Sequence, residues 1–407
     1  MFKKRVLAAV AAAVLASGAS AVEVNPGEKG EFLVAPLSMV GGGWESELRL
    51  INTDTVNSVV YKVAYHENVR SDEVLDFYVF LSPGDVFRGT AVRNADGTFG
   101  IKSDDDSALV VPNSGASGCP AATAQAVGFT PDVIKSSRPA DFTYVKVWQA
   151  RTYSLGAAPV AKSAILARYA ADCAAGTPFT AADTSNAVAG DLTLSNAGNG
   201  NVLQLPLKAL ANYDNQNYHV LGGATTFANN LSLSSKPAVE DSIWANDFAV
   251  PYNVTAGNMT YATVTFPTKE AFINGAGSQY FNTITTPTVA LTIRNEQEQT
   301  IGVTGCVVSP CPITPANSLP NELNVVAISA GAGVNTSSQL FTNTFTRGWV
   351  NMNIQPKAST ARSVANYNNF GQSGAPALVT YINWANKGAF LAGSWMYAPS
   401  TIAPAAR

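Results

Sequence analysis

The chain has 407 residues, of which 13% are charged and 46% are hydrophobic, and its formal net charge is −3. Charged residues make up about a quarter of an average globular protein, so neutral polar side chains should dominate this surface. A weakly acidic chain with no cluster of Lys and Arg beyond its first residues has little to offer the phosphates of a nucleic acid, and we expect no nucleic-acid partner.

The first 21 residues have the three parts of a secretory signal peptide. Lys3–Arg5 form a positive start, Val6–Leu15 form an apolar stretch, and Ala19–Ala21 match the small-residue cleavage pattern. The stretch is shorter than the roughly 20 residues that span a bilayer; a retained N-terminal anchor is the alternative. We therefore predict export to the periplasm, the cell surface or the medium, with no transmembrane segment after cleavage.

Alternation of apolar and polar residues dominates the rest of the chain and predicts β-strands. Strands with one apolar face must bury it against a second layer. The sequence therefore predicts a mainly all-β fold, an antiparallel β-sandwich. The segments with the clearest alternation are Ser58–His66, Val74–Leu81, Phe142–Trp148, Val289–Arg294, Trp349–Ile354 and Leu378–Trp384.

Helical patterns are few and short. Pro159–Ala171 fits either a helix or a strand, and Leu205–Tyr213 and Lys269–Asn274 allow a turn or two of helix. Because little helix separates the strands, parallel βαβ architecture is not expected. We predict one elaborated sandwich over 22–407, with a split into two domains near 213–240 as the alternative.

Four cysteines and an oxidising destination favour disulfide bonds. Four cysteines allow three connectivities, and we prefer Cys119–Cys173 and Cys306–Cys311. The first bond would tie together two long Ala- and Gly-rich loops at 112–130 and 170–190. A four-cysteine zinc site is the alternative, but the spacing lacks the paired hooks of such sites.

The sequence contains no recognisable nucleophile with its base. The two histidines are His66 and His219, and neither stands near a Ser or Cys in the pattern of a catalytic triad. Gly371–Gly374 begins like a nucleophile elbow, but Ala375 stands where the second motif glycine belongs. We interpret both histidines as solvated or core-edge side chains.

Two pairs of carboxylates could serve glycoside hydrolysis. Glu45 and Glu47 would project from one face of a strand, and so would Glu296 and Glu298. Residues two apart on a strand are about 7 Å apart, which fits an inverting pair. Arg49 shares the face of Glu45 and Glu47, so structural charge pairing is the simpler interpretation.

Asp104, Asp105 and Asp106 form the densest acidic run. Calcium takes six to eight oxygen ligands, often from clustered Asp in a loop, so calcium is the one cofactor that the sequence allows. The run does not fit the EF-hand loop pattern, and a solvated turn is the alternative.

Exposed aromatic side chains could bind sugars by stacking. Trp349 shares a strand face with Asn351 and Asn353, while the residues between them should face inward, and Trp44 follows three glycines. Tryptophan in a β-protein also serves in cores and interfaces, so both alternatives stay open.

One stretch resembles uncharacterised exported proteins of Gram-negative bacteria. The resemblance is carried, in order, by Val264–Lys269, Leu291–Gln297, Ser309–Pro312 and Leu319–Val326. It implies export and a β-rich fold, and it brings no catalytic residues.

Export, low charge, β-pattern and missing catalytic groups favour a secreted or cell-surface structural protein, such as a surface-layer, sheath or matrix component. It would associate with itself or with other surface proteins. A polysaccharide-binding or adhesion module, centred on exposed aromatic residues such as Trp349, is the first alternative, and a glycoside hydrolase-like enzyme is the second.

Overall fold

In a computed structural model the protein is mainly β: strands make up 62% of the residues that the structure describes, and one helix is found among them. The structure describes residues 23–25, 28–112, 127–156, 159–174, 185–212, 239–240, 242–245, 247–255, 258–269, 287–301, 319–328, 338–339, 346–355, 374–386, 391–398 and 400–401. The prediction of a mainly β, antiparallel fold is confirmed. The predicted signal peptide lies outside the described residues.

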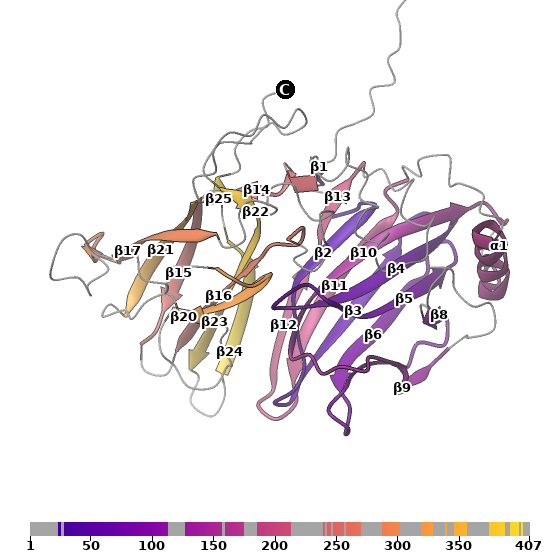
Figure 1. Ribbon diagram of the computed structural model, residues 1–407, viewed down its shortest axis with the longest axis horizontal. Helices are drawn as coiled ribbons and strands as arrows, with labels where there is room; N and C mark the ends of the chain where they lie inside the picture. Colours follow the sequence, from indigo (N-terminus) through magenta and orange to yellow (C-terminus); the bar gives the residue numbers. More distant parts are fainter. Residues whose placement is uncertain are drawn as a thin grey trace, which may run out of the picture.

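The first sheet pair consists of sheets A and B, which enclose a buried hydrophobic cluster (Figure 1). Their strand orders are β1-β13-β2-β10-β4-β5-β8 and β12-β11-β3-β6-β7-β9. Sheet A contains β1 (Glu23–Val24), β2 (Phe32–Met39), β4 (Ser58–Glu67), β5 (Glu73–Leu81), β8 (Leu109–Pro112), β10 (Phe142–Tyr153) and β13 (Lys208–Ala211). Sheet B contains β3 (Trp44–Asn52), β6 (Val86–Arg93), β7 (Phe99–Ser103), β9 (Phe129–Lys135), β11 (Val188–Asn196) and β12 (Asn201–Pro206).

The second sheet pair consists of sheets D and E, with orders β18-β17-β21-β15-β25 and β20-β19-β16-β23-β24. Sheet D contains β15 (Asp247–Asn253), β17 (Thr288–Asn295), β18 (Thr300–Ile301), β21 (Arg347–Gln355) and β25 (Ser400–Thr401). Sheet E contains β16 (Met259–Thr265), β19 (Leu323–Ala327), β20 (Ser338–Gln339), β23 (Leu378–Asn386) and β24 (Leu391–Tyr397). The small sheet C consists of β14 (Trp244–Ala245) paired with β22 (Ala375–Pro376).

Sheet E is buried on both faces. Val264, Val326 and Val379 point into the cluster shared with sheet D, whereas Tyr261 and Trp384 join the cluster of the first sheet pair. Alternate residues of β16, β19 and β23 therefore serve two different cores, as the two-residue period of a strand requires. The two sheet pairs lie side by side along the long axis of the molecule, with β24 next to β12 (Figure 1).

Aromatic and polar contacts close the seam between the two sheet pairs. Trp44 of β3 packs on Trp384 with ring centroids 5.6 Å apart. Tyr397 donates its hydroxyl to the carbonyl of Pro206 at 3.2 Å, and the Nζ of Lys208 lies 4.3 Å from the Tyr397 ring centroid. The prediction of a single unit, with a possible split near 213–240, stays a prediction.

The helix α1 (Lys162–Ala174) covers the far end of sheet A. The turn or two of helix that the sequence allows in Leu205–Tyr213 does not form in its described part, residues 205–212. β12 and β13 run through this part, and Leu205, Leu207 and Ala209 alternate into the core. Lys269–Asn274 lies almost wholly outside the described residues. No helix in the described part of the chain is long and apolar enough to cross a membrane.

The preferred disulfide bonds lie outside what the structure describes. Cys119, Cys306 and Cys311 fall in undescribed segments, as do His219 and Gly371–Ser373, and the side chain of Cys173 in α1 is not described. Both disulfide assignments stay predictions.

Candidate functional site

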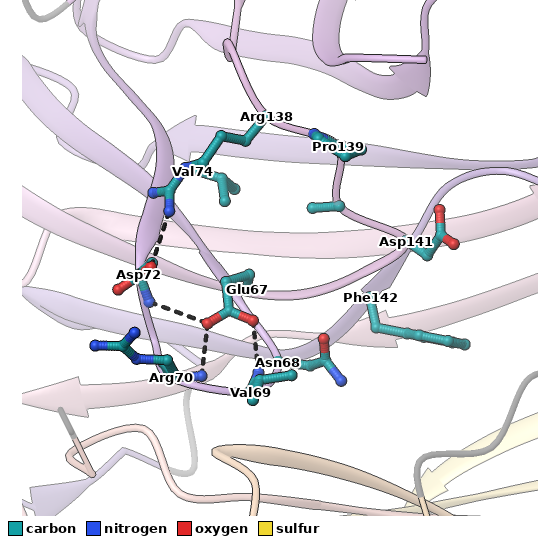
Figure 2. A pocket seen from close by; sticks show the side chains of 11 residues that line it. Glu67, Asn68, Val69, Arg70, Asp72, Val74, Arg138, Pro139, Asp141 and Phe142 are labelled. Atoms are coloured by element: carbon teal, nitrogen blue, oxygen red, sulfur yellow. Dashed lines mark hydrogen bonds and ion pairs between the residues drawn. The ribbon is translucent and has the colours of Figure 1, made fainter. Parts of the chain in front are cut away.

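A cleft of about 490 Å³ lies at the end of sheet A, where β4 turns into β5 (Figure 2). Two separate segments build it, the turn between β4 and β5 and the approach to β10. Its lining residues are Glu67, Asn68, Val69, Arg70, Asp72, Val74, Arg138, Pro139, Ala140, Asp141 and Phe142.

Glu67 organises the turn that forms one wall. Its carboxylate accepts the backbone N–H groups of Val69 at 2.6 Å and of Arg70 at 2.5 Å, and more weakly that of Asp72 at 3.4 Å. Ser71 takes a left-handed backbone conformation with φ of 57°. Glu67 therefore holds the turn that follows it, and the backbone N–H dipoles of the turn compensate the charge of its carboxylate.

The other two acids of the cleft are engaged by arginines. Arg138 donates to the Asp72 carboxylate at 2.8 Å and to the carbonyl of Glu73 at 3.2 Å. Asp141 pairs with Arg93. Both Arg138 and Asp141 remain substantially exposed, so their ion pairs fix geometry more than they stabilise the fold.

A buried polar network stands behind the cleft and ties it to sheet E. The backbone N–H groups of Glu322 and Leu323 both donate to the carbonyl of Asn68 at 3.0 Å. The buried Glu322 carboxylate accepts from the Ser71 hydroxyl at 2.9 Å, and Ser71 also bonds Tyr144. The second sheet pair thereby fixes the position of the cleft wall.

His66 belongs to this network and is 6% exposed. Its ring stacks on Tyr144 with centroids 5.1 Å apart, and its Nδ1 lies 3.0 Å from the carbonyl oxygen of Ser71. This placement at the edge of the core agrees with our interpretation of His66.

A buried charge cluster lies on sheet A near the cleft. The side chain of Lys62 is wholly buried, with its Nζ 2.6 Å from Asp76 and 3.9 Å from Glu73. Glu73 lines a smaller hollow of about 220 Å³. Desolvation raises the pKa of Glu73 to about 7, with Lys62 opposing the shift and Asp76 adding to it. One lysine thus serves two carboxylates, and Asp76 is the closer partner.

The carboxylates proposed for hydrolysis on sheet B are paired with cations. Lys102 donates to both oxygens of Glu45 at 2.9 Å. Arg49 lies 2.7 Å from Asp191 and 3.9 Å from Glu47. The geometry favours structural charge pairing on this face, and the catalytic interpretation stays an untested prediction.

The other acidic candidates lie in turns. Glu296 and Glu298 are exposed in the turn after β17, not on one face of a strand. Asp104 pairs with Arg88 at 2.8 Å, and Asp105 accepts from Ser107. Among the described residues, no three His, Cys, Asp or Glu side chains stand together as metal ligands, and calcium at Asp104, Asp105 and Asp106 stays a prediction.

The Trp349 strip lies on the outer face of sheet D. Val350, Met352 and Ile354 are buried as the alternation predicts, and Trp349, Asn351 and Asn353 are half-buried on the opposite face. Trp349 stands opposite Pro251 and Arg294 on the neighbouring strands. Sugar binding by this strip stays a prediction, whereas Trp44 packs in the seam.

A stretch of 91 residues is 37% identical to the Regulator of rDNA transcription protein 6 of Saccharomyces cerevisiae. The match covers 22% of this chain and 27% of the yeast protein, so the chain spans about a quarter of that relative's length. No family model and no solved structure matches. The finding contradicts the resemblance to exported Gram-negative proteins, because the matched protein is eukaryotic.

Proposed function

We propose that this chain is an exported, non-catalytic structural protein of a surface layer, sheath or matrix, built as a rigid block of two β-sandwiches. The observation that carries the proposal is the seam, in which sheet E shares one buried cluster with the first sheet pair and another with sheet D. A block joined in this way resists bending between its halves, as a building unit must.

The edge strands of the described sheets are protected or short, so copies of the protein should associate through the faces of the sheets and not through their edges. β9 carries Pro131, Asp132 and Lys135, residue types that discourage strand addition. β12 lies against β24, and the other described edge strands have two to four residues. The outward side chains of β3, β6, β11 and β12 are exposed or half-buried for most of their length, so the outer face of sheet B supplies a broad contact surface.

The test is the assembly state of the protein without its first 21 residues, followed by light scattering and electron microscopy over a wide concentration range, with and without calcium. We expect ordered oligomers, and cell fractionation should find the protein in the envelope or matrix. Thr193→Arg, which places a bulky cation on the outer face of sheet B, should reduce assembly, whereas Val56→Arg in an exposed turn should not. A dispersed monomer under all conditions refutes the proposal.

A further inference from the structure

We propose that the cleft between the β4–β5 turn and the start of β10 binds a neutral oligosaccharide. This site goes beyond the structural role proposed above and does not depend on it. It also differs from the Trp349 strip, which lies on the other sheet pair.

The charge of the cleft decides the class of ligand. Its acids are Glu67, Asp72 and Asp141, and each already has partners: backbone N–H groups, Arg138 and Arg93 respectively. Arg70 also lines the cleft, so the three carboxylates are matched in number by three guanidinium groups and their formal charges cancel. A balanced cleft gives an anionic ligand no net attraction, whereas a neutral polyol meets charges that are already compensated.

The cleft also presents hydrogen-bonding groups with capacity to spare. Arg138 uses two of its five N–H groups on Asp72 and on the Glu73 carbonyl. Within the described part of the chain, neither the guanidinium of Arg70 nor the side-chain amide of Asn68 has a hydrogen bond or ion pair. These planar groups can donate to sugar hydroxyls, and the Asn68 amide oxygen can also accept from them.

Apolar side chains complete the arrangement. Val74 and Ala140 are buried residues of the cleft lining, and the half-buried Phe142 lies across the cleft from Arg138 (Figure 2). A cleft that combines an aromatic ring with polar groups suits a sugar, whose C–H face is apolar and whose rim carries hydroxyls. The volume of about 490 Å³ is within the usual range of about 300–1,000 Å³ for ligand sites.

The wall of the cleft is preorganised. Glu67 holds the turn from within, and Glu322 and Leu323 hold Asn68 from sheet E. A ligand therefore need not order this loop, which lowers the entropic cost of binding.

The test is isothermal titration calorimetry on the protein that lacks its first 21 residues. The ligands are cellohexaose, maltohexaose, xylohexaose and mannohexaose, and hexagalacturonate serves as the acidic counterpart. We expect at least one neutral hexasaccharide to bind, and hexagalacturonate to bind more weakly. Asn68→Ala and Arg70→Ala should each weaken binding about tenfold or more. Phe142→Leu, which keeps an apolar contact with the core, should weaken it through loss of the ring.

The matched control is Arg168→Ala, because Arg168 is an exposed arginine on α1 that pairs with Asp172. It should bind like the wild type, and all variants should keep the wild-type melting temperature. Absence of binding to every neutral saccharide, tighter binding of hexagalacturonate, or equal affinity in the wild type and the three cleft variants each overturns the proposal.

Discussion

Glu73 should make the stability of the protein depend on pH. The folded state raises the pKa of this carboxyl to about 7 from an ordinary value of 4.5, so the folded protein holds the proton more tightly than the unfolded chain does. The free energy of unfolding contributed by this group is then fully present below about pH 4.5 and is lost as the pH rises through about 7.

The size of the loss follows from the shift. Each pKa unit corresponds to about 1.4 kcal/mol, so the shift from 4.5 to about 7 sets an upper limit of about 3.5 kcal/mol for this group. A quarter of the Glu73 side chain reaches solvent (26%), so we expect about 2 kcal/mol after allowing for screening by water. The variant Glu73→Gln removes the charge, keeps the shape and leaves Lys62 with Asp76, its nearest partner.

The assay is urea unfolding of the wild type and Glu73→Gln at pH 4.5 and pH 8, followed by tryptophan fluorescence. The two proteins should be equally stable at the lower pH, and the variant should be more stable than the wild type by about 2 kcal/mol at the higher pH. The matched variant Glu45→Gln changes an exposed acid paired with Lys102 and should not remove the pH dependence. Parallel stability curves for the wild type and Glu73→Gln would refute the reasoning.

Two further predictions concern the packing of the second sheet pair. Trp384→Ala removes the partner of Trp44 from the seam and should cost about 3–5 kcal/mol, measured by urea unfolding; a loss under 1 kcal/mol would show that the seam carries little of the stability. Gly348→Ala places a Cβ on the backbone carbonyl of Arg294 at a φ of 153°, so it should lower the melting temperature sharply, and a melting temperature equal to that of the wild type would contradict the close approach of β21 and β17.

Strands could be predicted from the sequence where apolar and polar residues alternate strictly. Where the alternation is irregular, the sequence alone did not exclude a helix. Val350, Met352 and Ile354 face a core because every second residue of a strand points the same way. The sequence of Leu205–Tyr213 also allowed a helix because its leucines fit a helical turn. Only the pairing of β12 with β11 and of β13 with β2 shows that this segment forms strands. Propensity alone cannot decide such a short apolar run.

The cleft could not be predicted, because it depends on contacts between distant segments. Glu67 and Arg138 are 71 positions apart in the chain, and nothing in the sequence near either residue indicates that they line the same cleft. The one local sign was the polar stretch from Glu67 to Asp72, which ends a strand and predicts a turn without indicating its partner.

The seam also determines when the chain can finish folding. Trp44 lies near the start of the chain, and its partner Trp384 lies close to the end, as does Tyr397, which bonds Pro206. β16 and β19 cover part of the seam side of the first core, and a chain emerging N-terminus first leaves the remainder uncovered until β23 and β24 appear. Loss of β23 and β24 by truncation would leave that apolar surface open to aggregation, so the molecule depends on synthesis of its full length far more than two independent domains would.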